Sequence, residues 1–168
     1  MKTPLVELPV STCAGQFITR YSKKGLAELD FPPVGTPRCG VRTSQRDVPT
    51  EVRRWHQATV AALKNVLAGR SPGKFPPFDL SSGTTFQRKV WNLLRKIVRG
   101  QTKSYGEIAR AVDKPKAVRA VGGACGANPI PIFVPCHRVL AANKKLGGFS
   151  GGLNRKRELL ARESVMFR

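Results

Sequence analysis

Residues 128–139 read NPIPIFVPCHRV. An apolar stretch with prolines at both ends is followed directly by an adjacent cysteine and histidine, Cys136 and His137. The thiolate is the nucleophile of cysteine chemistry, and hydrogen-bonding or cationic neighbours such as His137 and Arg138 would favour it. Adjacent side chains rarely point the same way, so we expect His137 to reach the thiol only through a tight turn or a bridging water. A cysteine beside a histidine is by itself more often structural than catalytic. Cys136 is therefore a candidate nucleophile that needs support from the rest of the chain.

Helical patterns precede this stretch. Residues 84–87 and 104–107 are capping boxes, each with Thr or Ser followed three residues later by Gln or Glu, and they predict two helix starts. We expect a third helix over about 116–125, with Pro115 in its first turn. A helix, a short turn and a small-residue helix are typical of a helix-turn-helix, although an ordinary helical hairpin fits the same pattern. The apolar positions expected to face the core are Phe86, Val90, Leu93, Leu94, Ile97, Ala117, Val118, Val121, Ala124 and Cys125.

The N-terminal half has the pattern of a small sheet and a helix. Residues 15–31 predict a β-hairpin, because two strand-like runs flank a polar turn that contains glycine. Helical spacing of apolar residues begins at Val52 and stops at Gly69, a suitable C-terminal cap. His56 lies beside that apolar stripe, where we expect packing or surface exposure rather than metal binding.

Chain length and composition fit one compact domain or two small lobes. The chain has 168 residues, 40% of them hydrophobic, which suffices to bury a core. A stretch rich in proline and glycine over about 69–83 predicts a linker. We therefore expect an α/β N-terminal lobe, residues 1–80, with a small antiparallel sheet plus a helix. A mainly helical C-terminal lobe with a helix-turn-helix, residues 84–168, would follow it.

The charge of the chain points to a polyanionic partner. The formal net charge is +20, and residues 84–168 contribute +14 of it against +6 for residues 1–83. Such an excess favours nucleic acid as the partner and the second half as the binding face. A basic surface that only serves solubility is the alternative.

Cysteine, histidine and hydropathy patterns limit the function classes further. The cysteines are Cys13, Cys39, Cys125 and Cys136, with neither a CxxC nor an HxxxH spacing, so we expect no metal site. The N-terminus carries no long apolar run and the chain no apolar stretch of membrane-spanning length. We therefore expect an intracellular protein without membrane contact, with reduced thiols and with Cys125 packed as a small apolar residue.

The motifs around Cys136 resemble the active-site signature of the O6-alkylguanine-DNA alkyltransferases, which are direct-reversal DNA repair proteins. The Asn-Pro-x-Pro lead-in and the following Pro-Cys-His-Arg-Val carry the resemblance. It extends to SYGEIA at 104–109, RAVGGA at 119–124 and GGFSGGL at 147–153, and then to Glu163. These motifs lie in the family's order and spacing over roughly residues 84–165, about half of the chain, so chance is a poor explanation.

The resemblance implies a role for each matching residue near the thiol. Cys136 would accept the alkyl group, His137 would take the thiol proton through a water molecule, and Glu163 would steady the resulting imidazolium. Tyr105 would help to turn the target phosphate, line the pocket and protonate the departing guanine. Asn128 would be the hinge residue that ties the helix-turn-helix to the active-site segment.

The resemblance also implies how DNA and the damaged base would be held. The helix-turn-helix would enter the minor groove, where Arg119 would fill the space of an extruded nucleotide. Ser150 would hydrogen-bond the base and Phe149 would form a wall, without the hydroxyl of the tyrosine that some members carry there. The small residues expected to allow close approach to DNA or base are Ala120, Gly122, Gly123 and Gly151.

The implied function is a single-turnover transfer of the alkyl group from O6-alkylguanine, or from O4-alkylthymine, in double-stranded DNA to Cys136. The thioether product resists water, so each molecule would act once, as a monomer and without a cofactor. The location would be the cytoplasm or nucleoid of a prokaryote or the nucleus of a eukaryote. A cysteine peptidase or acyltransferase is one alternative. A noncatalytic lesion-binding or regulatory DNA-binding protein is the other, and it would not need Cys136.

Overall fold

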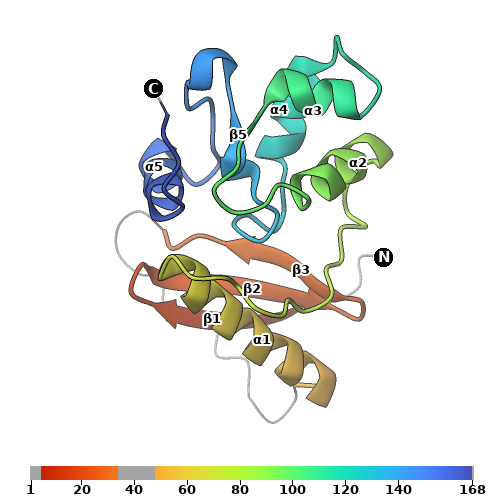
Figure 1. The fold of residues 1–168 in the computed structure, drawn as a ribbon. Coiled ribbons are helices and arrows are strands. Elements are labelled where there is room, and N and C mark those ends of the chain that lie inside the picture. The colour runs from red at the N-terminus through yellow and green to blue at the C-terminus, as the bar shows by residue number, and fades with distance from the viewer. Residues whose placement is uncertain (1–4, 34–47, 168) are drawn as a thin grey trace. The chain divides into compact units, whose positions relative to one another are not determined.

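The computed structural model describes residues 5–33 and 48–167, and the chain divides after Leu80 into two compact units (Figure 1). The first unit ends at Leu80 and the second begins at Ser81. Cys39 lies outside the described residues, whereas Cys13, Cys125 and Cys136 are free thiols. The predicted fold class, a small antiparallel sheet with a helix and then a mainly helical lobe with a helix-turn-helix, is confirmed.

The first unit is built on a three-stranded antiparallel sheet. Its strands are β1 (Val6–Thr12), β2 (Gly15–Ser22) and β3 (Gly25–Asp30), in the order β1-β2-β3. Phe17 pairs with Val10, and Thr19 pairs with Leu8 and Leu29, so that one face of the sheet is buried. On the other face Arg20 forms ion pairs with Glu7, Glu28 and Asp30. The alternation of buried and ion-paired positions fixes the register of the sheet.

The hairpin predicted over residues 15–31 is present as β2 and β3, but the sequence analysis missed β1. Pro9 lies inside β1, and proline counts against a strand because it cannot donate to the ladder. β1 is an edge strand with β2 as its partner, which is the position where a strand tolerates proline.

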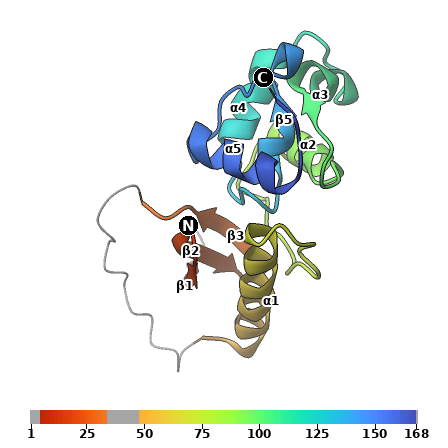
Figure 2. The ribbon, with the colours of Figure 1, turned by 60° about the vertical axis from the view of Figure 1, so that its left-hand side comes forward.

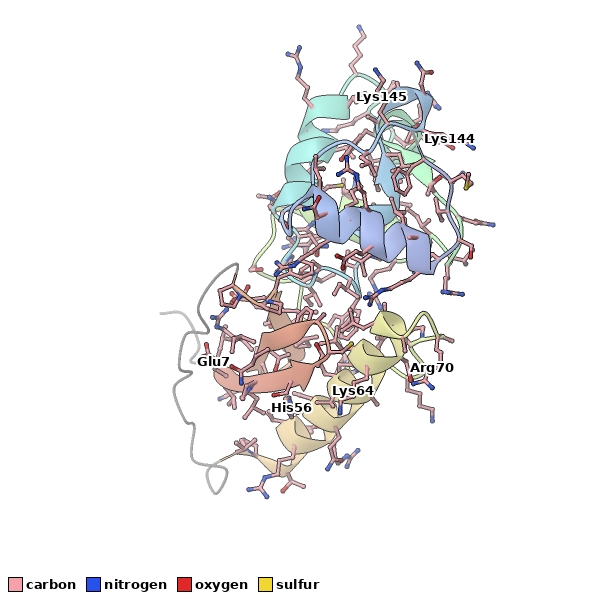
Figure 3. All side chains as sticks on the ribbon, turned by 90° about the vertical axis from the view of Figure 1, so that its left-hand side faces the viewer. Glu7, His56, Lys64, Arg70, Lys144 and Lys145 are labelled. Carbon is pink, nitrogen blue, oxygen red and sulfur yellow. The ribbon has the colours of Figure 1, made fainter. Side chains whose placement is uncertain are left out.

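Helix α1 (Thr50–Leu67) covers the buried face of the sheet, as Figures 1 and 2 show. It begins two residues before the predicted start and ends where the glycine signal placed it. His56, labelled in Figure 3, packs edge-on against Tyr21, with Nδ1 3.1 Å from the tyrosine hydroxyl. His56 thus packs against the sheet, one of the two positions expected for it.

The second unit contains four α-helices within the described residues: α2 (Thr85–Leu94), α3 (Tyr105–Ala111), α4 (Val118–Gly126) and α5 (Leu153–Arg162). Both predicted capping boxes are formed, at the starts of α2 and α3. Trp91 is buried and donates from Nε1 to the carbonyl of Ala124 at 2.8 Å, which ties α2 to α4. Helices α3 and α4, with the turn between them, are the helix-turn-helix.

Two details of the predicted helices were wrong. Helix α4 begins at Val118, so Pro115 lies in the preceding turn rather than in the first turn of the helix. Val118 is 41% exposed instead of facing the core, because it is the first residue of the helix, whereas Val121, Ala124 and Cys125 are buried as expected. A helix start leaves its first side chain without a preceding turn to pack against, which apolar spacing alone does not reveal.

Two short strands join distant parts of this unit. β4 (Lys103–Ser104) pairs in parallel with β5 (Val139–Leu140). This pairing holds the start of α3 beside the segment that follows the Cys-His-Arg turn. It thereby brings Tyr105 to the same region as Cys136.

No helix of the described residues is long and apolar enough to cross a membrane. Likewise, residues 5–33 and 48–167 hold no group of three or more His, Cys, Asp or Glu side chains arranged to bind a metal ion.

Gly83 offers a test of the packing between the start of the second unit and α2. A Cβ atom at Gly83 would collide with the ring of buried Trp91. We expect Gly83→Ala to lower the free energy of unfolding by about 1–3 kcal/mol, the usual cost of overpacking. Chemical denaturation followed by tryptophan fluorescence measures this change.

Gly123→Ala is the matched control, because Gly123 lies within α4 and a Cβ atom there meets nothing within 4 Å. It should be neutral or stabilise by up to about 1 kcal/mol, since alanine favours a helix over glycine. A Gly83→Ala variant as stable as the parent would show that the ring of Trp91 can move aside at no cost.

Candidate active site

Asn128 is the residue that holds the thiol of Cys136. Its side-chain Nδ2 donates to the carbonyl of Val134 at 2.7 Å and to Cys136 Sγ at 3.2 Å, while Oδ1 accepts from the amide of Ile130 at 3.1 Å. Asn128 lies just beyond the end of α4, and its own amide donates to the carbonyl of Cys125. One buried residue thus links α4, through its backbone, to the apolar stretch and the thiol, through its side chain.

Cys136 and His137 belong to a buried 3₁₀ turn, Cys136–Arg138, that leads into β5. The Nε2 atom of His137 lies 3.1 Å from Glu163 Oε1. Glu163 follows α5 and is also buried, at 7% exposure. Since an ionised carboxylate only accepts hydrogen bonds, Nε2 carries the proton and Nδ1 presents a lone pair. Within the described part of the chain, Nδ1 finds no hydrogen-bond partner.

Arg138 does not support the thiol, contrary to the sequence-based expectation. Its guanidinium donates to both carboxylate oxygens of Glu163, with distances of 2.8 Å from Nη2 to Oε1 and 2.9 Å from Nε to Oε2. It also donates to the carbonyl of Ile97. A planar guanidinium suits this two-point contact with a carboxylate. Arg138 therefore fixes Glu163, and Asn128 takes the place beside the sulfur.

The pKa values of these groups follow from burial and from their partners. Burial raises the pKa of the Cys136 thiol, against the opposing effect of the Asn128 hydrogen bond. Burial lowers the pKa of His137, although the contact with Glu163 opposes it. The pKa of Glu163 falls to about 2, because its hydrogen bonds to His137 and Arg138 outweigh burial. At neutral pH the thiol is thus protonated and the imidazole is neutral, which is the combination that proton transfer between them requires.

A cavity of about 350 Å³ lies beside the thiol. Its walls come from the start of α3, from α4 and from the glycine-rich loop before α5. The lining residues are Tyr105, Gly122, Cys125, Gly126, Cys136, Gly148, Phe149 and Ser150. The structure thus brings together around the thiol five of the predicted site residues, namely Tyr105, Gly122, Cys136, Phe149 and Ser150, with Asn128 and His137 directly behind it.

Aromatic side chains shape the cavity. The ring of Phe149 stands edge-on to the ring of His137, with 6.4 Å between their centroids. Tyr105 reaches the loop through its hydroxyl, 3.4 Å from the carbonyl of Gly148. Burial raises the pKa of Tyr105 to about 12. Tyr105 therefore stays protonated at neutral pH.

The remaining predicted residues lie away from the cavity. Arg119, Ala120 and Gly123 are on the exposed face of α4, and Gly151 is half-buried in the loop but does not line the cavity. A Cβ atom at Gly122 or Gly123 would meet nothing within 4 Å. Helix α4 thus has one side toward the cavity and a smooth side with a single long cation toward solvent.

Sequence reasoning missed two contributions to this site. Cys125 is buried as expected, but it also lines the cavity, and burial raises its pKa to about 12. Lys156, on α5, was given no role by the sequence, although its side chain is fully buried. The helical spacing of Lys156, Leu159 and Glu163 was a signal that could have found it, since a lysine shares the buried face of a helix only when it has polar partners.

Comparison with known proteins identifies the family. Residues 85–165 match the model of the 6-O-methylguanine DNA methyltransferase, DNA binding domain. The crystal structure of Mycobacterium tuberculosis OGT in complex with DNA is similar over 92% of this chain and 90% of that chain, with a TM-score of 0.74 and 36% identity. The chain belongs to the O6-methylguanine-DNA methyltransferase family.

The curated methyltransferases match about half of the chain. The methylated-DNA–protein-cysteine methyltransferase of Mycolicibacterium paratuberculosis is 53% identical over 94 residues, 54% of this chain and 57% of that protein. The protein of the same name from Haemophilus influenzae is 52% identical over 85 residues, 51% of this chain and 48% of that protein. The matches thus span about half the length of these curated relatives. The resemblance seen in the motifs around Cys136 is confirmed.

The ionised Glu163 should make the stability of this methyltransferase-family chain depend on pH. Its pKa of about 2 lies below the ordinary value of 4.5, so its stabilisation is complete above pH 4.5 and is lost as pH falls toward 2. We expect Glu163→Gln to be less stable than the parent at pH 7, and the difference to shrink between about pH 5 and pH 2. Denaturation at a series of pH values measures it.

Glu158→Gln is the matched control, because Glu158 is an exposed glutamate on the same helix. It should retain the pH dependence of the parent chain. A parallel loss of stability with falling pH in the parent and in Glu163→Gln would contradict an ionised, paired Glu163.

Proposed function

We propose that this protein repairs alkylated DNA by moving the alkyl group of O6-alkylguanine, with O4-alkylthymine as a second substrate, to Cys136. The observation that carries the proposal is the protonated thiol of Cys136 at a cavity, with a neutral histidine behind it whose Nδ1 lone pair has no partner among the described residues. The names of the curated relatives support the same reaction.

Each bond in the proposed step has a matching group in the site. The Cys136 sulfur attacks the alkyl carbon, the S–C bond forms, and the C–O6 bond breaks with its electrons moving to guanine. The thiol proton passes through a water molecule to Nδ1 of His137, and Glu163 stabilises the imidazolium through Nε2. The hydroxyl of Tyr105, which its raised pKa keeps protonated at neutral pH, donates a proton to the departing guanine. The proton held by the imidazolium of His137 then returns through water to the tyrosinate, so that the charges balance. The thioether product is stable in water, so each molecule acts once, without a cofactor.

The target base enters the cavity after leaving the DNA stack. Extrusion costs a few kcal/mol, and less for a weakened base pair. The smooth exposed side of α4, with Ala120 and Gly123, suits close contact with the minor groove, and Arg119 fills the space of the extruded nucleotide. The charge of +14 on residues 84–168 supplies attraction to the phosphates.

The glycine-rich loop holds the base once it has been extruded. Ser150 hydrogen-bonds the base and Phe149 forms one wall, while the backbone at Gly151 lets the loop approach a flat ring. Asn128 keeps the thiol aimed at the cavity through its hydrogen bond to the sulfur. The protein acts as a monomer on double-stranded DNA, in the cytoplasm or nucleoid of a prokaryote or in the nucleus of a eukaryote.

The alternatives explain fewer of these features. A cysteine peptidase or acyltransferase would use the same thiol, imidazole and carboxylate, but it leaves the helix-turn-helix and the basic second unit without a role. A lesion-binding or regulatory protein explains those two features, but it does not need a thiol held by Asn128 at a cavity.

Mass spectrometry of the protein after incubation with a duplex that contains one O6-methylguanine tests the proposal. We expect one added methyl group per molecule, on the peptide that carries Cys136, with no further turnover in excess duplex. The same duplex should then contain unmodified guanine.

Cys136→Ala is the control and should remain unmodified while still binding the duplex. If the parent chain binds the duplex but Cys136 stays unmodified, the lesion-binding alternative holds. Turnover of a model ester or peptide with an unmodified thiol would favour the hydrolase instead.

Arg119 tests the extrusion step separately from the chemistry. We expect Arg119→Ala to slow methyl transfer from duplex DNA at least about tenfold, equivalent to about 1.4 kcal/mol. The reason is that no side chain would then occupy the space that the extruded nucleotide leaves in the duplex. The reaction of Cys136 with iodoacetamide, which needs no DNA, should remain unchanged. Arg119→Lys keeps the charge without the planar group, so complete recovery in that variant would reduce Arg119 to a phosphate contact.

A further inference from the structure

Lys156 is a charged side chain with no exposed surface, and the mechanism above does not use it. Its ammonium Nζ donates to the carbonyl of Val139 at 2.7 Å and to the carbonyl of Gly148 at 3.3 Å. A buried ammonium is costly unless polar partners replace its hydration. Two backbone carbonyls from separate segments provide that replacement.

Both carbonyls belong to parts of the site. Val139 follows directly on the turn that carries Cys136 and His137, and it opens β5. Gly148 lines the cavity, and its carbonyl also accepts from the hydroxyl of Tyr105. Lys156 therefore bridges the segment that carries the nucleophile and the loop that forms the cavity wall.

Helix α5 and the residue that caps it bring two opposite charges to the site. Lys156 lies on α5 and Glu163 follows its last residue, seven positions or about two helical turns later, on the same side of the helix. Glu163 is neutralised by Arg138 at 2.8 Å. Within residues 5–33 and 48–167, Lys156 is the one lysine that is buried. A thiolate formed at Cys136 would be a further buried negative charge, and Lys156 is placed to compensate it.

We propose that Lys156 is a positioning residue of the site, which holds the cavity wall at Gly148 against the nucleophile segment and favours the thiolate of Cys136 by its charge. This inference rests on the proposed function for its meaning, but its thiol chemistry does not require DNA. One ammonium group thus holds the cavity wall and the nucleophile segment in place relative to each other.

The electrostatics point the same way. Burial lowers the pKa of Lys156 to about 8, while the charges of Cys136 and Cys125 oppose that fall. In return, the charge of Lys156 opposes the burial-driven rise in the pKa of Cys136. Removal of the cation should therefore raise the pKa of the Cys136 thiol and shift its reactivity to higher pH.

The test is the rate of Cys136 alkylation by iodoacetamide as a function of pH, read by peptide mass spectrometry in the full chain. We expect Lys156→Met to move the midpoint for Cys136 upward by about one pH unit or more. Lys156→Arg, which keeps the charge, should stay near the parent profile. Lys145→Met removes the same charge from an exposed site, labelled in Figure 3, and should leave the profile unchanged.

The chain carries its own reporters of folding. The exposed Cys13 should keep one profile in all variants, and the buried Cys125 should stay slow as long as the second unit is folded. An unshifted Cys136 profile in Lys156→Met, with Cys125 still protected, would overturn the proposal and leave Lys156 a purely structural residue. If Cys125 becomes reactive in Lys156→Met, the arginine variant decides: a profile near the parent supports the proposal, and an upward shift overturns it.

Transfer from the O6-methylguanine duplex is measured in the same variants. Lys156→Met should slow it at least about tenfold at pH 7, because less thiolate forms and the cavity wall is released. If the parent chain transfers no methyl group, the proposed function fails, yet the iodoacetamide profiles still decide the role of Lys156.

Discussion

The site depends on the hydrogen bonds that the carboxylate of Glu163 accepts. This carboxylate accepts from Nε2 of His137, from the guanidinium of Arg138 and from the amide of Gly100. These donors come from two segments, so one buried charge connects the end of α5 with the Cys-His-Arg turn and with the segment before β4. Because each donor also satisfies the carboxylate, its burial is tolerated. The hydrogen bond to His137 also fixes the tautomer of the imidazole, with the proton on Nε2. One contact therefore both connects the segments of the fold and leaves Nδ1 free to accept a proton.

Helix α4 packs against the core on one side and presents small residues to the cavity and to solvent on its other sides. Toward the core it places Val121 and Ala124, with the carbonyl of Ala124 held by Trp91. Toward the cavity it has Gly122, Cys125 and Gly126, and toward solvent it carries Arg119 and Gly123. In the proposed function, these small residues would leave room for the extruded base on one side and for DNA on the other. The stability of such a thin helix comes from its neighbours rather than from its own helix propensity.

Local signals predicted the parts of this fold that local interactions create. The capping boxes at residues 84–87 and 104–107 form as predicted, since each closes within one turn. The β2-β3 hairpin is equally local. The sequence analysis missed β1, whose proline obscured an edge strand, and the β4-β5 pair, whose two partners are more than 30 residues apart. The exposure of Val118 was also missed, because it depends on where the helix begins.

By itself the sequence determined the family, the fold class and the candidate nucleophile, because these follow from motif order and helical spacing. Only the tertiary structure decided which groups surround the thiol. Arg138 donates to Glu163, Asn128 donates to the sulfur of Cys136, and the buried ammonium of Lys156 donates to two backbone carbonyls. The reason is physical: a buried charge or thiol is governed by the nearest polar atoms in space, and those atoms come from segments that chain spacing does not bring together.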